Sequence, residues 1–244
     1  MEDTQQQQQQ QTAQDTLSDS AWTGLAALLL WSETLQQYVT EEGAVVAPRA
    51  VRAVLDEILA GGAEEAKRLL RQVRRGDISI GHWQRRMQRL SRNAHLTGAA
   101  VARGGFGQLS AQAQREVEDA LSRQFERLAR FARQIENGLP LDGLALQRAG
   151  GYVQAARTTY EQVRLRGMEE AGFTEERNIL DPEAESCEQC LTLTAAGWRP
   201  IGSMPPPGER TCLYNCRCRL ERRGSAEGGP FSELKVSPQG ELLR

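Results

Sequence analysis

Lysine, histidine and aromatic residues are scarce in this chain of 244 residues. Lys67 and Lys235 are the only lysines, so nearly all 30 basic side chains are arginines, and aromatic residues make up 5% of the chain. The longest apolar run, Gly24 to Trp31, is far short of the roughly 20 residues that span a bilayer. Met1 is followed by acidic residues and glutamines, which is not the pattern of a secretory signal. We therefore expect no membrane association, and a reducing cytoplasm where cysteines are seldom paired.

Motifs of common catalytic sites are also missing. The sequence has neither a Gly-x-Ser-x-Gly motif nor a Gly-x-x-x-x-Gly-Lys phosphate loop. Gly104-Gly105-Phe106-Gly107 does not follow a strand pattern, so we interpret it as a turn between helices. His82 and His95 are the only histidines, and neither has a partner at metal-binding spacing. We predict capping or surface roles for both histidines, no enzymatic activity and no small-molecule substrate.

Charge is distributed unevenly, although the formal net charge is only −2. Residues 1–66 carry a net charge of −9, residues 67–135 a net charge of +10, and the remainder a net charge of −3. The acidic and basic segments can complement each other as solvated helix faces, which is the interpretation we favour. Contact between the basic segment and nucleic acid is the alternative.

The first part of the chain passes from low complexity to helical periodicity. Residues 1–19 include an unbroken glutamine run, and we predict a disordered tail there. Ser20 is a candidate N-cap for a helix that carries apolar residues from Trp22 to Tyr38. Pro48 marks a second helix that we expect to end at Gly61-Gly62.

Further helices are predicted up to residue 171. Residues 63–75 form a short helix, and Ser79 caps another with Trp83 on its apolar face. The most regular helix runs from Ser110 to Asn137, because apolar residues repeat at steps of three and four: Val117, Leu121, Phe125, Leu128, Ala132 and Ile135. A helix from Leu144 to Ala171 follows, weakened by Gly150-Gly151. No segment before residue 175 alternates as a strand does.

Composition changes near residue 176. Residues 177–223 contain all five cysteines and five of the nine prolines, with short apolar pieces instead of helical stripes. The sequence predicts a mainly α fold, in which a helical body over residues 20–176 precedes a small zinc-ribbon-like module over residues 177–223. Residues 224–244, rich in glycine, serine and proline, are expected to be a flexible tail.

The cysteines lie in two groups, and none occurs in the first 186 residues. Cys187 and Cys190 form a Cys-x-x-Cys turn, and Cys212, Cys216 and Cys218 follow 21 residues later. A Cys-x-x-Cys turn directs two thiolates at one centre, and a second group completes a tetrahedron around zinc. A module of this size with few large apolar residues needs such a cross-link. The sequence therefore predicts one structural zinc ion.

Five cysteines compete for four ligand positions. Cys187 and Cys190 form the first pair, and Cys216 is the firmest member of the second pair. Its partner, Cys212 or Cys218, stays open. A disulfide and a redox-active Cys-x-x-Cys are less favoured alternatives, because the expected compartment is reducing and no thioredoxin-like pattern surrounds the motif. Four thiolates on Zn²⁺ leave a charge of −2, which nearby arginines can offset: Arg199, Arg210, Arg217, Arg219, Arg222 and Arg223.

The cysteine motifs resemble a known family. A Cys-x-x-Cys turn, a spacer with Gly-Trp and prolines, and the sequence Asn215-Cys216-Arg217-Cys218 are similar to the C-terminal module of tailed-phage minor head proteins related to that of Mu-like phages. The family's second group typically reads His-Pro-Asn-Cys-Arg-Cys. Leu213 and Tyr214 stand at the His and Pro positions here, and Cys212 lies one place earlier, where it can substitute for the histidine ligand. The resemblance covers about residues 180–222.

The resemblance implies a structural role in head morphogenesis. Proteins of this kind associate with the portal or the capsid during head assembly, so the expected partners are portal and capsid proteins, with contact to packaged DNA as a further expectation. The expected location is the virion head, and the host cytoplasm during assembly. The alternative is a zinc-ribbon nucleic-acid-binding or regulatory protein that uses the basic segment 67–135.

Overall fold

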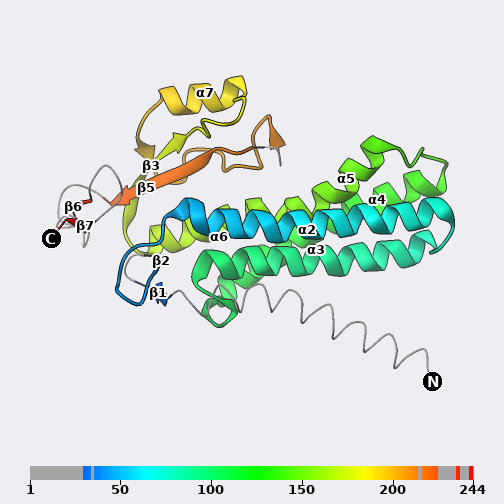
Figure 1. Cartoon of the computed structure of the whole chain (residues 1–244), viewed down its shortest axis with the longest axis horizontal. Coiled ribbons are helices and arrows are strands. Elements are labelled where there is room, and N and C mark those ends of the chain that lie inside the picture. The colour runs from blue at the N-terminus through cyan, green and yellow to red at the C-terminus, as the bar shows by residue number, and fades with distance from the viewer. Residues whose placement is uncertain (1–29, 34–35, 214–215, 225–234, 237–241, 244) are drawn as a thin grey trace.

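The structure is a computed structural model that describes residues 30–33, 36–213 and 216–224, and the short strands at 235–236 and 242–243. Figure 1 shows long helices side by side, with a small sheet and a short helix at one end. The fold is mainly helical, with a small sheet near the C-terminus, as the sequence predicts. The predicted glutamine-rich tail over residues 1–19 lies outside the described residues.

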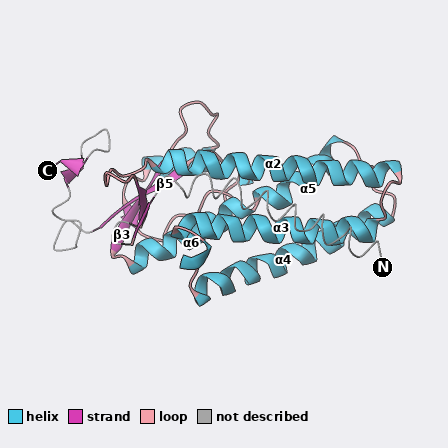
Figure 2. Ribbon diagram, turned by 60° about the horizontal axis from the view of Figure 1, so that its bottom comes forward, coloured by secondary structure: helices cyan, strands magenta, loops and turns pink. Residues whose placement is uncertain are grey.

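Five helices form the bundle, which we define as residues 48–170. They are α2 (Pro48–Arg75), α3 (Ile80–Arg103), α4 (Ala111–Glu136), α5 (Gly143–Gln154) and α6 (Ala156–Glu170). Helix α3 packs against α2, α4 and α6, whereas α5 packs mainly on α2. Figure 2 shows the strands at one end of this bundle. Its interior is a single apolar cluster that includes the fully buried side chains of Leu55, Trp83, Leu128 and Phe131.

The start of α3 agrees with the predicted cap at Ser79, and α4 begins directly after Ser110, where the sequence places the start of that helix. The Ser79 hydroxyl accepts a hydrogen bond from the His82 amide, and the Ser110 hydroxyl accepts one from the Ala113 amide. These bonds satisfy amide groups that the helix leaves without a partner. The stripe predicted on α4 faces inward, and its members Val117, Leu121 and Leu128 are at most 1% exposed. Helical periodicity was therefore sufficient to place α4.

The helix predicted through Tyr38 is wrong in the part that the structure describes. Leu30–Ser32 forms β1 and Gln37–Val39 forms β2, paired antiparallel with Trp31 opposite Tyr38. The two rings meet edge to face at 5.0 Å, and the Tyr38 hydroxyl donates to the carbonyl of Val101 on α3. These contacts to distant residues stabilise strands where local spacing favours a helix.

The end predicted at Gly61-Gly62 is also wrong, because α2 continues to Arg75. A Cβ on Gly62 would lie 2.9 Å from Cγ1 of Val153, so the glycine allows α5 to approach closely. Tertiary packing thus offsets the weak helix propensity of glycine. The helix ends instead at Gly76, whose φ of 79° is left-handed.

The last predicted helix is two helices rather than one. The chain changes direction at Ala155, between α5 and α6, and not at Gly150-Gly151. Gly150 packs against α2, where a Cβ would lie 3.4 Å from the Cβ of Ala63. Gly150 therefore serves helix contact, and neither glycine interrupts α5.

A three-stranded antiparallel sheet follows the bundle. Its central strand is β3 (Phe173–Ile179), flanked by β4 (Arg199–Pro200) and β5 (Arg219–Gly224), and α7 (Glu188–Ala195) packs on β3. We call residues 173–224 the cysteine module. The boundary predicted at residue 176 falls inside β3, so the strand begins earlier than its composition indicates.

Two shorter features complete the description. Lys235–Val236 (β6) and Leu242–Leu243 (β7) pair antiparallel within the segment predicted as a flexible tail, and the rest of residues 225–244 lies outside the described residues. Among the residues that the structure describes, no helix is both long and apolar enough to cross a membrane.

Candidate metal centre

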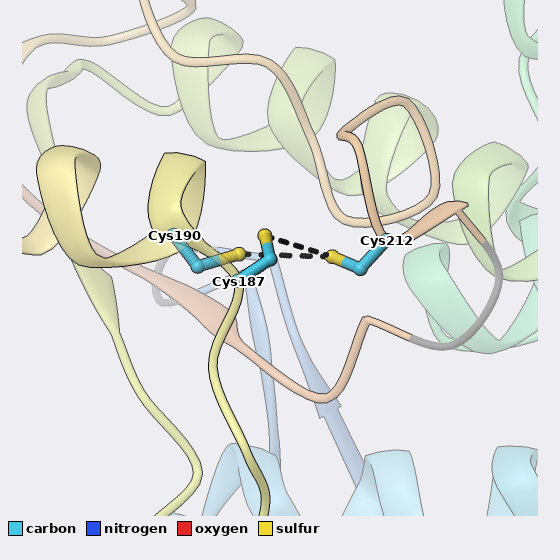
Figure 3. Close-up of side chains that lie close together, drawn as sticks. All are labelled: Cys187, Cys190 and Cys212. Carbon is cyan, nitrogen blue, oxygen red and sulfur yellow. Dashed lines mark hydrogen bonds between the residues drawn. The ribbon is translucent and has the colours of Figure 1, made fainter.

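The five cysteines converge in the cysteine module. Cys187 precedes the first turn of α7 and Cys190 lies within that turn, while Cys212 comes from the loop after the proline-rich spacer. Cys216 and Cys218 lie just before β5. Figure 3 shows Cys187, Cys190 and Cys212 pointing toward one another from α7 and the opposite loop. A turn, a loop and a strand entrance thus bring together residues that are up to 31 positions apart.

The sulfur atoms have the spacing of a tetrahedral thiolate site. Sγ of Cys212 lies 3.6 Å from Sγ of Cys187 and 3.7 Å from Sγ of Cys190, and Sγ of Cys190 lies 3.9 Å from Sγ of Cys216. A tetrahedron with metal–sulfur distances of about 2.3 Å has sulfur–sulfur edges of about 3.8 Å. All five are free thiols, so none of these distances is a disulfide. The cluster can therefore hold a metal ion.

Cys190 is the centre of the cluster. Its Sγ belongs to two groups of three thiols, one with Cys187 and Cys212 and the other with Cys216 and Cys218, and the sulfurs within each group lie within 4.8 Å of one another. The structure brings all five predicted residues together. The sulfur contacts of 3.6–3.9 Å join Cys187, Cys190, Cys212 and Cys216, and Cys218 belongs to the group with Cys190 and Cys216.

The thiols differ in their preference for the charged form. Burial raises the pKa of Cys190 far above its ordinary value and that of Cys212 to about 12. The backbone amide of Cys190 lowers the pKa of Cys187. Burial acts against ionisation of Cys216 too, but hydrogen bonds from Cys212 and the backbone at Cys218 hold its pKa below the ordinary value. Four thiolates at neutral pH therefore require a cation that displaces protons.

Arg210 supplies positive charge directly beside the sulfurs. This side chain is 1% exposed, and its Nη1 lies 3.7 Å from Sγ of Cys190 and 3.9 Å from Sγ of Cys216. It also donates to the Pro205 carbonyl and to Oδ1 of Asn178. Within the described residues no carboxylate lies within 4.0 Å of this guanidinium. A buried charge without a counter-ion is costly, so this position of Arg210 favours the thiolate form of the neighbouring cysteines.

The other arginines predicted to offset the cluster charge act elsewhere. Arg222 is buried against Glu161 and Glu176, and Arg223 stacks over Trp198 and pairs with Glu175. Arg199, Arg217 and Arg219 are exposed. In the part of the chain that the structure describes, Arg210 alone of the six contacts a cysteine sulfur.

Asn178 and Gln189 position the two cysteine groups. The buried Asn178 amide donates to the Cys190 carbonyl and to Oγ1 of Thr194, so it links β3 to α7. Oε1 of Gln189 accepts hydrogen bonds from the amide and the hydroxyl of Thr211, next to Cys212. Sequence reasoning did not find these residues. The position of Gln189 inside the Cys-x-x-Cys turn was the one available signal.

Arg52 connects the centre to the helix bundle. This residue lies on α2, and its guanidinium donates to the carbonyls of Cys218 at 2.6 Å and of Cys216 at 3.4 Å. It also pairs with Glu161 on α6, which in turn faces Arg222 and, through it, Glu176. The result is a buried row of alternating charges between the bundle and the module. Nothing local in the sequence signals it, because Arg52 is 164 residues from Cys216.

The two histidines lie in the bundle, on α3. Of the predicted capping or surface role of His82, the structure shows a half-buried side chain in the first turn of α3, whose backbone amide donates to the Ser79 hydroxyl. The surface role predicted for His95 is wrong: the side chain is 3% exposed, and Nδ1 lies 2.7 Å from Oγ1 of Thr159 on α6. Burial lowers the pKa of His95 to about 4, so the ring is neutral at pH 7. Neither histidine belongs to the metal-binding groups of the described residues.

Comparisons with protein-family models, with curated proteins and with solved structures gave no match. The role of the cluster is therefore argued from its own residues.

Proposed function

We propose that Cys187, Cys190, Cys212 and Cys216 bind one structural zinc ion, with Cys218 as a fifth thiol beside them. The observation that carries this proposal is Arg210, whose buried guanidinium has thiolates as its only anionic neighbours within the described residues. Bound zinc supplies a fixed link between α7, the loop at residue 212 and the start of β5. Thiolate ligands and tetrahedral spacing favour zinc over hard cations, which prefer oxygen.

We further propose that the centre is not catalytic. A catalytic zinc ion keeps one position for water or substrate, whereas four thiolates fill a tetrahedron. Arg210 donates to groups of the module itself. On this reading the metal replaces the apolar interior that such a small module lacks.

The wider role that we propose is that of a minor head protein of a tailed phage. Its support is the resemblance of Cys187-x-x-Cys190 and Asn215-Cys216-Arg217-Cys218 to that family's C-terminal module, together with a long helix bundle before it. In this role the bundle presents rigid faces to portal or capsid proteins, and the metal-stabilised module stays docked on the bundle through Arg52.

Metal analysis of reduced, purified protein tests the site. We expect one zinc ion per chain, lost in Cys190→Ser and Cys212→Ser and retained in Cys218→Ser, which is the matched control. Retention in Cys212→Ser with loss in Cys218→Ser would assign the other ligand set. Metal-free protein at neutral pH with a folded cysteine module would contradict the site altogether.

Mass spectrometry of gradient-purified particles tests the role in head assembly. Finding the chain at a few to tens of copies in heads made without tails would support a minor head protein. Its absence from every particle fraction, while it is present in the producing cells, would count against a place in the particle. The zinc site does not depend on this result.

A further inference from the structure

The basic segment divides into arginines that face carboxylates and arginines that do not. Arg68, Arg75 and Arg92 each lie within 4.0 Å of a carboxylate. On α4, by contrast, four exposed arginines have no carboxylate within that distance among the described residues: Arg123, Arg127, Arg130 and Arg133. The complementary solvated faces favoured by the sequence therefore account for only part of the basic segment, and for none of these four arginines.

Three of these arginines form one row. Arg123, Arg127 and Arg130 are separated by four and three residues, which places them on one face of α4 over about 10 Å at 1.5 Å per residue. The row occupies the middle and the C-terminal part of α4. The α4 residues that face the core, including Leu121 and Leu128, lie on the opposite side.

Arg148 from α5 joins the row. Its guanidinium lies 4.1 Å from the centroid of the Phe131 ring and donates to Oε1 of Gln134, so it is held beside α4 without a carboxylate. Burial raises the pKa of Tyr152, but the charges of Arg148, Arg127 and Arg130 act together against that increase. We call Arg123, Arg127, Arg130 and Arg148 the α4–α5 arginine surface.

The α4–α5 arginine surface has a positive net charge. Glu126 is the acidic residue between the arginines of the row, and it lies more than 4.0 Å from any guanidinium of the described residues. Four arginines and one glutamate leave a net charge of +3. Arginine side chains left without carboxylate partners offer forked N–H groups, which match the oxygen geometry of phosphates.

We infer that the α4–α5 arginine surface binds the phosphate backbone of a nucleic-acid duplex without reading its sequence. Along one strand of a duplex a phosphate occurs every 3.4 Å of axis, so a row of about 10 Å faces about three phosphates. The neighbouring aromatic rings, Phe131 and Tyr152, are buried, so the surface has no ring on which an unpaired base could stack. This favours a duplex over a single strand.

Fluorescence anisotropy with a labelled 30-base-pair duplex of mixed sequence tests this inference on the full-length, metal-loaded protein. Four phosphate contacts predict a slope of about −3.6 for log affinity against log salt, which is a loss of about 100-fold between 50 and 200 mM NaCl. The variant in which all four arginines become glutamine should lose this binding. Arg127→Gln alone should make the slope shallower by about 0.9.

A variant with the same change in net charge is the control. Arg68, Arg75, Arg92 and Arg177 each face a carboxylate, and their joint substitution by glutamine should preserve duplex binding. Circular dichroism verifies that both variants keep the bundle. Equal loss in both variants, absence of binding at 50 mM NaCl, or selective binding of phosphatidylglycerol vesicles in place of DNA would overturn the inference.

Discussion

The helix bundle and the cysteine module differ in what fills their interiors. The bundle encloses a continuous apolar cluster from all five of its helices. The corresponding cluster of the module consists of three buried cysteines with Leu180 and the two half-buried cysteines beside them. Around these lie buried charged and polar groups: Glu176, Asn178, Arg210 and Arg222. The bundle therefore derives its stability from apolar burial, and the module depends on its thiols and their partners.

The two regions also meet through charge. At their contact, Arg52 and Glu161 of the bundle face Arg222 and Glu176 of the module, and these four side chains are at most 10% exposed. A buried ion pair contributes little net stability, but removal of one member leaves an uncompensated charge. The four charges together thus add little to the stability of the contact, whereas a substitution that removes one of them should destabilise it.

Metal removal should have the largest effect and should separate the two regions. Chelation of the metal removes about 10 kcal/mol of apparent binding energy, which the module cannot replace by apolar burial. We expect residues 173–224 to lose protection in hydrogen exchange while α3 and α4 keep theirs. Far-ultraviolet circular dichroism should change little, because α7 is the only described helix in the module. Simultaneous loss of protection in α3 and α4 would contradict this independence.

Arg52→Met should have the next largest effect. It removes the donor to the Cys216 and Cys218 carbonyls and leaves Glu161 with Arg222 alone, which predicts a destabilisation of about 3–5 kcal/mol. Denaturant unfolding measures the loss. Arg49→Met is the matched control, because Arg49 is exposed on the same helix. An equal change in both variants would show that the contact with the module contributes nothing specific.

The bundle could be predicted to the extent that its signals are local. The spacing of apolar residues such as Val117 and Leu121 placed α4 to within a residue at each end, because helix contacts are formed by neighbours in sequence. Trp31 and Tyr38 are seven residues apart, a spacing that suits a helix face as well as it suits a hairpin. Their strand pairing depends on α3, which local periodicity does not represent.

The metal centre likewise has features that local sequence predicts and features that depend on contacts between distant residues. The Cys-x-x-Cys spacing and the bunching of all five cysteines are local signals, and they predicted the cluster. The choice between Cys212 and Cys218 is not given by local spacing, and in space both belong to groups of three thiols that share Cys190. The buried contacts of Arg52 and Glu161 were not predicted, because a charged residue on a helix is normally exposed to solvent. Their burial depends on the module that packs against the helices, which local sequence does not indicate.

Arg210→Met should weaken the metal site without removing a ligand. The substitution keeps the approximate volume but takes away the charge beside Cys190 and Cys216, and outer partners of this kind are worth about 10–100-fold in metal affinity. Competition with a zinc chelator of known affinity measures the change. Arg199→Met, an exposed substitution in β4, should leave the affinity unchanged. An Arg210 variant with unaltered affinity would remove the main support for a charged thiolate cluster.

His95 should make the bundle, and not the module, sensitive to moderate acid. Its pKa of about 4 in the folded protein lies below the ordinary 6.5. Between these two pH values the histidine is protonated in the unfolded chain and neutral in the folded protein. Stability from this group is complete above pH 6.5 and is lost as the pH falls toward 4, by about 2 kcal/mol at pH 5. His95→Gln should remove this component from denaturant unfolding measured on chelated protein, where thiol titration no longer contributes. Identical pH profiles in wild type and variant would mean that the Thr159 contact holds the ring without excluding its charge.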